Sequence, residues 1–229
     1  DYHIKMKKQF KLFISGTGTD VGKTFITENL IYLLKSKGLT VSPYKPIETG
    51  CKKIKVKLIP SDANKFYELI NKEIDIDLIN PYRFQDPISP HRAIKLANKK
   101  IFIKDYIDKS KLLPKNDYLI IEGAGGLYSP ISTDGYNIDL IKKMKIPTVL
   151  VAKDEIGVIN NILLSLDLLL KHKISVLAIV LNKMNNIQPN QMDNYKDIKS
   201  LTKTPLIKIH NTKTKNHKEF LKLLKIIST

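Results

Sequence analysis

The sequence predicts a single α/β domain in which helices cover both faces of a mainly parallel sheet. Short apolar runs alternate along the chain with longer segments of helical periodicity, which is the pattern of βαβ units. A glycine-rich turn at residues 16–24 joins the first apolar run to the first helical segment. The 229 residues, of which 42% are hydrophobic, suit one domain with a substantial core.

Strands are expected where apolar residues run together, and helices where apolar residues recur every three to four positions. The expected strands cover residues 11–15, 40–44, 118–122, 148–152, 176–181 and 206–209. The expected helices cover about residues 23–37, 62–71, 137–144, 158–171, 191–201 and 216–227. Parallel sheets bind ligands beyond the carboxyl ends of their strands, so functional residues are expected in the loops that follow these strands.

The domain is expected to occupy residues 7–229. Residues 1–6 lack the apolar segment of a secretory signal and end at an internal Met6, which suggests an expression remnant followed by a start. The longest apolar run, residues 157–170, is interrupted by polar side chains and is too short to cross a bilayer. Cys51 is the single cysteine, which suits a reducing compartment. We therefore expect a cytoplasmic protein without a membrane span.

The formal charge of +17 invites a nucleic-acid interpretation, because lysines that neutralise phosphates drive non-specific binding. Arg83 and Arg92 are the only arginines, although arginine is preferred for base readout and bidentate phosphate binding. The lysines are spread along the chain, and their local excess at residues 213–225 fits the polar face of a terminal helix. We therefore expect a solvated lysine-rich surface, with neither nucleic acid nor membrane as a partner.

The turn after the first strand has the composition of a phosphate-binding loop and predicts a P-loop NTPase-like fold. Backbone N–H groups and the helix dipole favour phosphate oxygens at such a helix start. Lys23 is placed to neutralise the terminal phosphates and Thr24 to hold Mg²⁺. Five residues separate Gly16 from Gly22, one more than in the standard loop. The nucleotide-binding residues expected here are Gly18, Thr19, Asp20, Val21, Gly22, Lys23 and Thr24.

Three further charged residues each have a functional and a structural interpretation. Lys45 ends the second strand, so it is either a second cation at the ligand-binding edge or a surface lysine beside a proline turn. Glu122 ends the third strand, where P-loop enzymes place an acidic residue near Mg²⁺, although a tight turn also explains its glycine-rich continuation. Asp62 either caps a helix or binds the metal.

The phosphate loop and five further segments together resemble the dethiobiotin synthetase family. The family's loop has the same longer spacing as residues 16–24. The other matching segments are residues 44–50, 61–63, 80–91, 122–126 and 157–160. They follow the family's order and span most of residues 11–182, so the combination is far more specific than the phosphate loop alone.

The resemblance implies an enzyme of biotin biosynthesis, an ATP-dependent cyclo-ligase that joins CO₂ to 7,8-diaminononanoate and releases ADP and phosphate. One amine captures CO₂ as a carbamate, a carbamate oxygen takes the γ-phosphoryl group, and the second amine closes the ring and expels phosphate. Cations are the expected catalysts, because negative charge accumulates on the carbamate and the phosphoryl group. The resemblance also implies a homodimer, for which the leucine-rich helix at residues 158–171 is a candidate face, although burial within the monomer explains it equally well.

Roles for individual residues follow from the same resemblance. The implied catalytic residues are Lys23, Lys45, Thr19 and Thr49, with Lys45 steadying the carbamate and phosphoryl oxygens. The implied Mg²⁺ ligands are Thr24, Asp62 and Glu122, and the implied substrate-binding residues are Lys45, Thr49, Gly125 and, from the partner subunit, Asn160. Glu122 and Asn182 join the loop in nucleotide binding, Asn182 by reading adenine. Asp20 stands where the family often has glutamate, and residues 208–211 replace its usual Ile-Pro segment, which leaves the choice of nucleoside triphosphate open.

Two other classes of protein share this kind of nucleotide site and remain alternatives. An amide-forming ligase of the cobyrinate type normally carries an added glutaminase domain, for which 229 residues leave no room. A deviant-loop ATPase, which positions septa or plasmids, carries an extra lysine where this chain has Gly18, and it has no need of Lys45. The dependence of ADP release on diamine and bicarbonate distinguishes the three classes.

Overall fold

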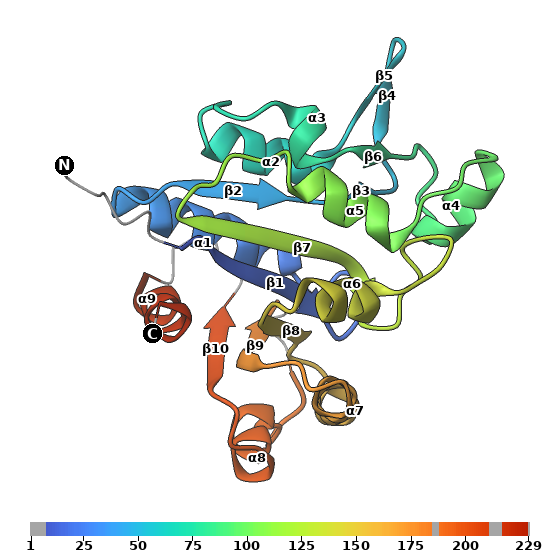
Figure 1. Ribbon diagram of the computed structural model, residues 1–229. Helices are drawn as coiled ribbons and strands as arrows, with labels where there is room; N and C mark the ends of the chain where they lie inside the picture. The colour runs from blue at the N-terminus through green and yellow to red at the C-terminus, as the bar shows by residue number, and fades with distance from the viewer. Residues whose placement is uncertain (1–7, 185–187, 211–216, 229) are drawn as a thin grey trace.

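A computed structural model describes residues 8–184, 188–210 and 217–228 and has the predicted α/β architecture (Figure 1). A six-stranded sheet forms its centre in the order β10-β9-β8-β1-β7-β2, and every pairing in that sheet is parallel. The predicted remnant at residues 1–6, Asn211 of the base segment and the predicted helix start at residue 216 lie outside the described residues.

The central sheet and its helices lie close to the predicted ranges. The strands are Phe10–Gly16 (β1), Val41–Tyr44 (β2), Tyr118–Gly126 (β7), Thr148–Lys153 (β8), Val176–Lys183 (β9) and Leu206–His210 (β10). The predicted helices are found at Lys23–Ser36 (α1), Ser61–Leu69 (α2), Asn137–Met144 (α6), Val158–Lys171 (α7), Asn194–Leu201 (α8) and His217–Ile227 (α9). The fold prediction is therefore confirmed, with bounds shifted by a few residues.

Helices cover both faces of the sheet. Consecutive side chains of β1 and β8 point to opposite faces and are nearly all buried, as in sheets covered on both sides. On one face α1 contacts α2 and α9. On the other face α5 (Ile103–Ser110) packs against α6 (Figure 1). No helix in the described part of the chain is long and apolar enough to cross a membrane.

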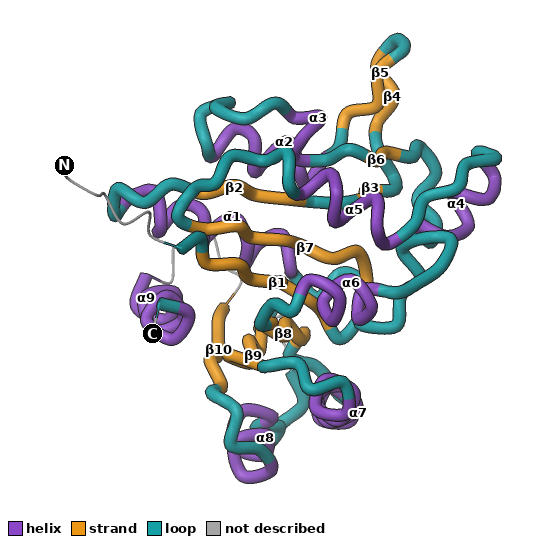
Figure 2. The backbone as a smooth tube through the Cα atoms, viewed as in Figure 1, coloured by secondary structure: helices purple, strands orange, loops and turns teal. Residues whose placement is uncertain are grey.

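The segment between β2 and β7 contains most of the structure that the sequence did not predict. Its additional elements are Ile47–Glu48 (β3), Lys52–Ile54 (β4), Lys57–Ile59 (β5), Ile76–Ile79 (α3), Tyr82–Arg83 (β6), Pro90–Leu96 (α4) and α5. β3 pairs with β6, and β4 pairs with β5 in a hairpin that projects from the body (Figure 2). Strands of two or three residues are too short to show an alternating pattern, which is why the sequence missed them.

The leucine-rich helix α7 divides its apolar residues between the core and the surface. Ile162 and Leu169 are fully buried in the monomer. Leu163, Leu164 and Leu170 are exposed on the other side of the same helix, Leu164 to 63% and Leu170 to 76%. Burial within the monomer therefore explains only one face of α7.

Candidate active site

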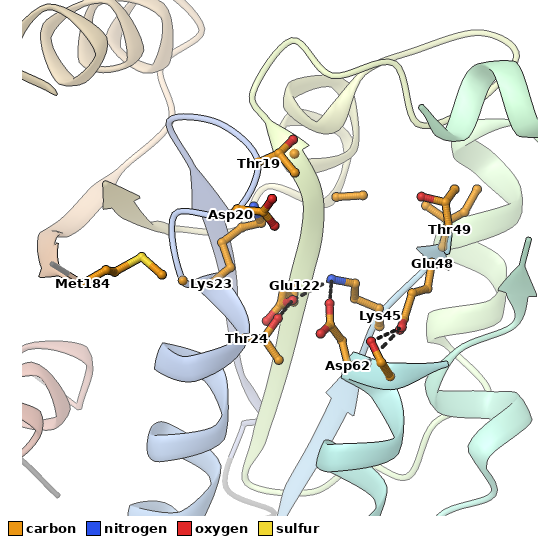
Figure 3. A pocket seen from close by; sticks show the side chains of 15 residues that line it. Thr19, Asp20, Lys23, Thr24, Lys45, Glu48, Thr49, Asp62, Glu122 and Met184 are labelled. Carbon is orange, nitrogen blue, oxygen red and sulfur yellow. Dashed lines mark hydrogen bonds and ion pairs between the residues drawn. The ribbon is translucent and has the colours of Figure 1, made fainter. Parts of the chain in front are cut away.

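A cavity of about 580 Å³ opens where the segments after β1, β2 and β9 meet the second half of β7 and the start of α2, at the predicted edge of the sheet (Figure 3). Ten of the predicted site residues line it: Thr19, Asp20, Gly22, Lys23, Thr24, Lys45, Thr49, Asp62, Glu122 and Gly125. Five more were not predicted as site residues: Ile47, Glu48, Ser61, Ala124 and Met184. Lys23 and Lys45 reach into this cavity from opposite walls, with Glu122 between them (Figure 3).

The phosphate loop depends on a glycine at its junction with α1. Gly22 has a φ of +96°, and a Cβ atom there would lie 2.0 Å from Nδ2 of Asn182. Nδ2 of Asn182 donates a hydrogen bond to the Val21 carbonyl oxygen at 3.0 Å, so Asn182 supports the loop from behind. Asn182 is fully buried and is not among the residues that line the cavity. Its proposed contact with adenine stays a prediction.

Lys23 is the first residue of α1, and its side chain is buried against the phosphate loop. Its Nζ donates to the carbonyl oxygen of Gly18 at 2.9 Å. Burial and the nearby Lys45 ammonium lower the pKa of Lys23 to about 8, against the opposing effect of the carboxylates Glu122, Asp62 and Asp20. An ammonium has three N–H donors, so Lys23 keeps two for an anionic ligand whose charge would favour its protonated form.

Glu122 is a fully buried carboxylate at the centre of the site. Its Oε1 accepts hydrogen bonds from Nζ of Lys45 at 2.6 Å and from Oγ1 of Thr24 at 2.9 Å. Its Oε2 accepts one from Oγ1 of Thr27 at 2.5 Å. A tight turn alone does not explain Glu122, because its carboxylate accepts hydrogen bonds from residues on both walls of the cavity.

Lys45 is also buried, with 4% of its surface exposed, so the surface-lysine interpretation is wrong. Its Nζ donates to Glu122 and, at 3.0 Å, to Oδ2 of Asp62. Burial by itself lowers the pKa of Lys45, but the carboxylates of Glu122, Asp62 and Glu48 outweigh it and hold that pKa above its usual value. Lys45 therefore stays charged at neutral pH.

Asp62 does not cap α2, so that interpretation is wrong as well. The cap is supplied by Glu48, whose carboxylate accepts hydrogen bonds from the backbone N–H groups of Asp62 and Ala63 at 2.9 and 3.1 Å. The Asp62 carboxylate is turned to Lys45 instead. Burial raises the pKa of Asp62, but the charge and hydrogen bond of Lys45 outweigh burial and hold it below its usual value.

The predicted Mg²⁺ ligands bring together hard oxygen donors. Among the described residues, no three His, Cys, Asp or Glu side chains are grouped to hold a metal. The set of Thr24, Asp62 and Glu122 has two carboxylates and one hydroxyl, which suits Mg²⁺ because that ion usually takes its remaining ligands from phosphate and water. Four carboxylates and two ammonium groups line the cavity, so their formal sum of −2 suits a divalent cation.

The remaining predicted residues lie outside this cavity. Asn160 is exposed on α7, and the Val21 side chain is buried beneath the loop. Gly18 lines a neighbouring cavity of about 660 Å³, between the phosphate loop and α7, together with Tyr128 and Leu164.

Comparisons with known proteins agree with this geometry. The profile of a protein family described as an AAA domain matches residues 11–209. An ATP-dependent dethiobiotin synthetase from Halalkalibacterium halodurans is 37% identical over 199 residues, which cover 85% of this chain and 81% of the relative. A second, from Clostridium novyi, is 33% identical over 224 residues, covering 93% and 92% of the two chains. The chain belongs to the dethiobiotin synthetase family. It is accordingly an ATP-dependent ligase.

Solved structures resemble this family member in fold at much lower identity. A plasmid partition protein from Borrelia burgdorferi has a TM-score of 0.59 at 16% identity and covers 96% of this chain and 99% of its own. The MinC:MinD cell division complex of Aquifex aeolicus has a TM-score of 0.52 at 16% identity, over 95% of this chain and 85% of the other. These similarities support the P-loop fold alone, and the relatives at higher identity decide the family.

Proposed function

We propose that this member of the dethiobiotin synthetase family converts 7,8-diaminononanoate, CO₂ and ATP to dethiobiotin, ADP and phosphate in the cytoplasm. The observation that carries the proposal is the pair of buried lysines on opposite walls of one cavity, with Glu122 between them. A plain P-loop ATPase needs the first lysine, and the second suits a reaction that gains negative charge beside the γ-phosphate.

In this proposal the phosphate loop and Lys23 bind the nucleotide. The two N–H donors that Lys23 does not use on Gly18 are available to phosphate oxygens. Thr24, Asp62 and Glu122 would hold Mg²⁺, which would offset the charge of the β- and γ-phosphates. Asn182 would keep the loop in its binding conformation through its bond to Val21.

Lys45 would act on the carbamate. The diamine amine attacks CO₂, loses a proton and becomes a carbamate, whose oxygen attacks the γ-phosphorus and displaces ADP. The second amine then attacks the carbamate carbon, loses a proton and expels phosphate, which closes the ring. Lys45 uses two of its three N–H donors on Glu122 and Asp62, and the third is available for a carbamate or phosphoryl oxygen.

The other proposed substrate contacts come from both walls. Thr19 and Thr49 supply hydroxyl groups that line the cavity, and Asp20 supplies a carboxylate at the loop. Gly125 has a φ of +73°, and a Cβ atom there would lie 2.2 Å from Oγ of Ser129, so the backbone at this wall of the cavity requires glycine.

We also propose a homodimer in which Asn160 of one subunit receives the substrate's distant carboxylate in the other. The exposed face of α7 supports this, because Leu163, Leu164 and Leu170 leave apolar surface uncovered in the monomer. Asn160 is exposed near the start of the same helix, which is where a partner could reach it.

The test is an assay of ADP release with both diamine and bicarbonate present and with each omitted in turn. The proposal predicts ADP release that requires both compounds and matches the amount of cyclised product. ADP release that is unaffected by the diamine would instead favour a positioning ATPase. Release that requires an amide donor would favour the cobyrinate type of ligase.

A further inference from the structure

The Glu48 carboxylate bridges two active-site segments that are separated by a projecting hairpin. Glu48 is on β3, and α2 begins at Ser61, with β4 and β5 between them. Oε1 of Glu48 accepts hydrogen bonds from the Asp62 N–H at 2.9 Å and from Oγ of Ser61 at 3.3 Å. Oε2 accepts one from the Ala63 N–H at 3.1 Å. A single buried side chain thus satisfies three donors at the start of α2.

Helix α2 has no local residue that could replace this cap. Its N-cap position is Pro60, which has no polar side chain, and no local side chain bonds its first N–H groups. Unsatisfied N–H groups at a helix start are costly when buried, and loss of a cap destabilises a helix. Glu48 therefore determines where the first turn of α2 lies relative to β3.

That first turn carries Asp62, which pairs with Lys45. The backbone N–H of Asp62 is held by Glu48, while its carboxylate accepts Nζ of Lys45 at 3.0 Å. Lys45 in turn donates to Glu122. A continuous set of hydrogen bonds thus leads from Glu48 through Asp62 to the two residues at the centre of the cavity (Figure 3).

We propose that Glu48 is a positioning residue that fixes Asp62 for metal binding and for its contact with Lys45. This rests on the proposed function, in which Asp62 is a Mg²⁺ ligand. Both carboxylate oxygens of Glu48 accept hydrogen bonds from the first turn of α2, so these hydrogen bonds connect Glu48 to the site through Asp62.

The test uses a non-hydrolysable ATP analogue, so that its outcome does not depend on ring closure. Mg²⁺ is titrated against the analogue with wild type, Glu48→Ala and Glu48→Gln. We expect Glu48→Ala to raise the Mg²⁺ concentration for half-maximal binding about tenfold, the size seen when groups that orient metal ligands are removed. Glu48→Gln keeps one accepting oxygen and should fall between wild type and Glu48→Ala. Binding of the analogue without metal should be unchanged. An unchanged Mg²⁺ requirement in Glu48→Ala would overturn the proposal.

A double-mutant cycle separates action through Asp62 from a general loss of stability. If Glu48 acts through Asp62, then adding Glu48→Ala to Asp62→Asn should change the Mg²⁺ requirement less than about twofold. A full tenfold change in that background would overturn the proposal. The matched control is Asp193→Ala, because Asp193 caps α8 by accepting the Lys196 N–H at 3.1 Å and does not line the cavity. Asp193→Ala should lower the melting temperature and leave the Mg²⁺ requirement unchanged, and an equal shift in that requirement would also overturn the proposal.

Wild type could bind the analogue with Mg²⁺ and yet form no cyclised product from ATP, diamine and bicarbonate. The proposed function would then fail, while the titration would still decide the positioning role of Glu48. Under turnover, the positioning role predicts a kcat about tenfold lower in Glu48→Ala with a KM for ATP at saturating Mg²⁺ near that of wild type.

Discussion

The two walls of the cavity each present one buried lysine, and the two lysines have opposite surroundings. On the phosphate-loop wall, Lys23 bonds a neutral carbonyl and its pKa is lowered to about 8. On the other wall, Lys45 bonds two carboxylates and its pKa is raised. The Lys23 ammonium thus has no carboxylate as a hydrogen-bond partner, whereas the charge of Lys45 is already balanced by two carboxylates. Lys23 is suited to bind an anion tightly, whereas Lys45 is suited to stabilise charge that appears only during reaction.

The largest effect is expected for Lys23→Ala. Loss of the cation that faces the phosphates should weaken nucleotide binding and lower kcat/KM by roughly 10²- to 10³-fold, as for removal of other oxyanion-stabilising donors. Burial and the nearby Lys45 make the charged form of Lys23 unfavourable in the folded state, so its removal should not destabilise the fold. Circular dichroism and thermal melting check this. Turnover close to wild type would remove Lys23 from the phosphate site.

Glu122→Gln tests the carboxylate that joins the two walls. The amide keeps the shape of the side chain but loses the charge opposite Lys45 and one proposed Mg²⁺ ligand. Activity should fall about 10- to 100-fold and recover in part with excess Mg²⁺. Kinetics at increasing Mg²⁺ measure this, and a loss of activity that is independent of metal would show that Glu122 only positions Lys45.

Asn160→Ala tests a residue that lies on neither wall of the cavity and is proposed to bind substrate in the partner subunit. If Asn160 binds the diamine's carboxylate across a dimer, its removal should raise the KM for the diamine about tenfold, the loss of one hydrogen bond to a charged group. The KM for ATP should change little. Steady-state kinetics and sedimentation give both quantities. A fully active monomer would contradict the shared site.

A further prediction concerns the dependence of stability on pH. Since the pKa of Lys23 is about 8 in the folded chain and 10.5 in its reference state, the unfolded chain binds more protons between those values. Stability should therefore rise with pH across that window relative to Lys23→Met, by roughly 3 kcal/mol at most. Urea unfolding of both proteins from pH 7 to 11 measures the difference. A constant difference would contradict the lowered pKa.

The phosphate-loop wall could be predicted from sequence because its function depends on neighbours along the chain. Gly22, Lys23 and Thr24 are consecutive residues at a helix start. Lys45 directly follows β2 and Glu122 lies on β7, so the order of the strands brings these residues to one edge of the sheet. The extent of the central sheet was predicted for the same reason, since its strands are long enough to show their pattern.

On the opposite wall Lys45, Thr49 and Asp62 were predicted as site residues, but the contacts that hold them could not be predicted, because these contacts join residues that are far apart in sequence. Glu48 caps a helix that begins thirteen residues later, across a hairpin of three-residue strands. The Ser61-Asp62 pair looks like a local helix cap, and only the three-dimensional position of Glu48 frees Asp62 to contact Lys45. Met184 also lines the cavity, and nothing in its sequence context indicated a site residue.

The division of roles between the two lysines is tested most directly by Lys45→Met in single-turnover experiments with pre-bound ATP, diamine and bicarbonate. Nucleotide affinity should stay near that of wild type, because the loop and Lys23 are intact. Phosphate release should slow by roughly one to two powers of ten, since a charge-assisted hydrogen bond made in the transition state is lost. If ATP affinity collapses while the rate at saturation is preserved, Lys45 is a nucleotide-binding residue and the proposed division of roles is wrong.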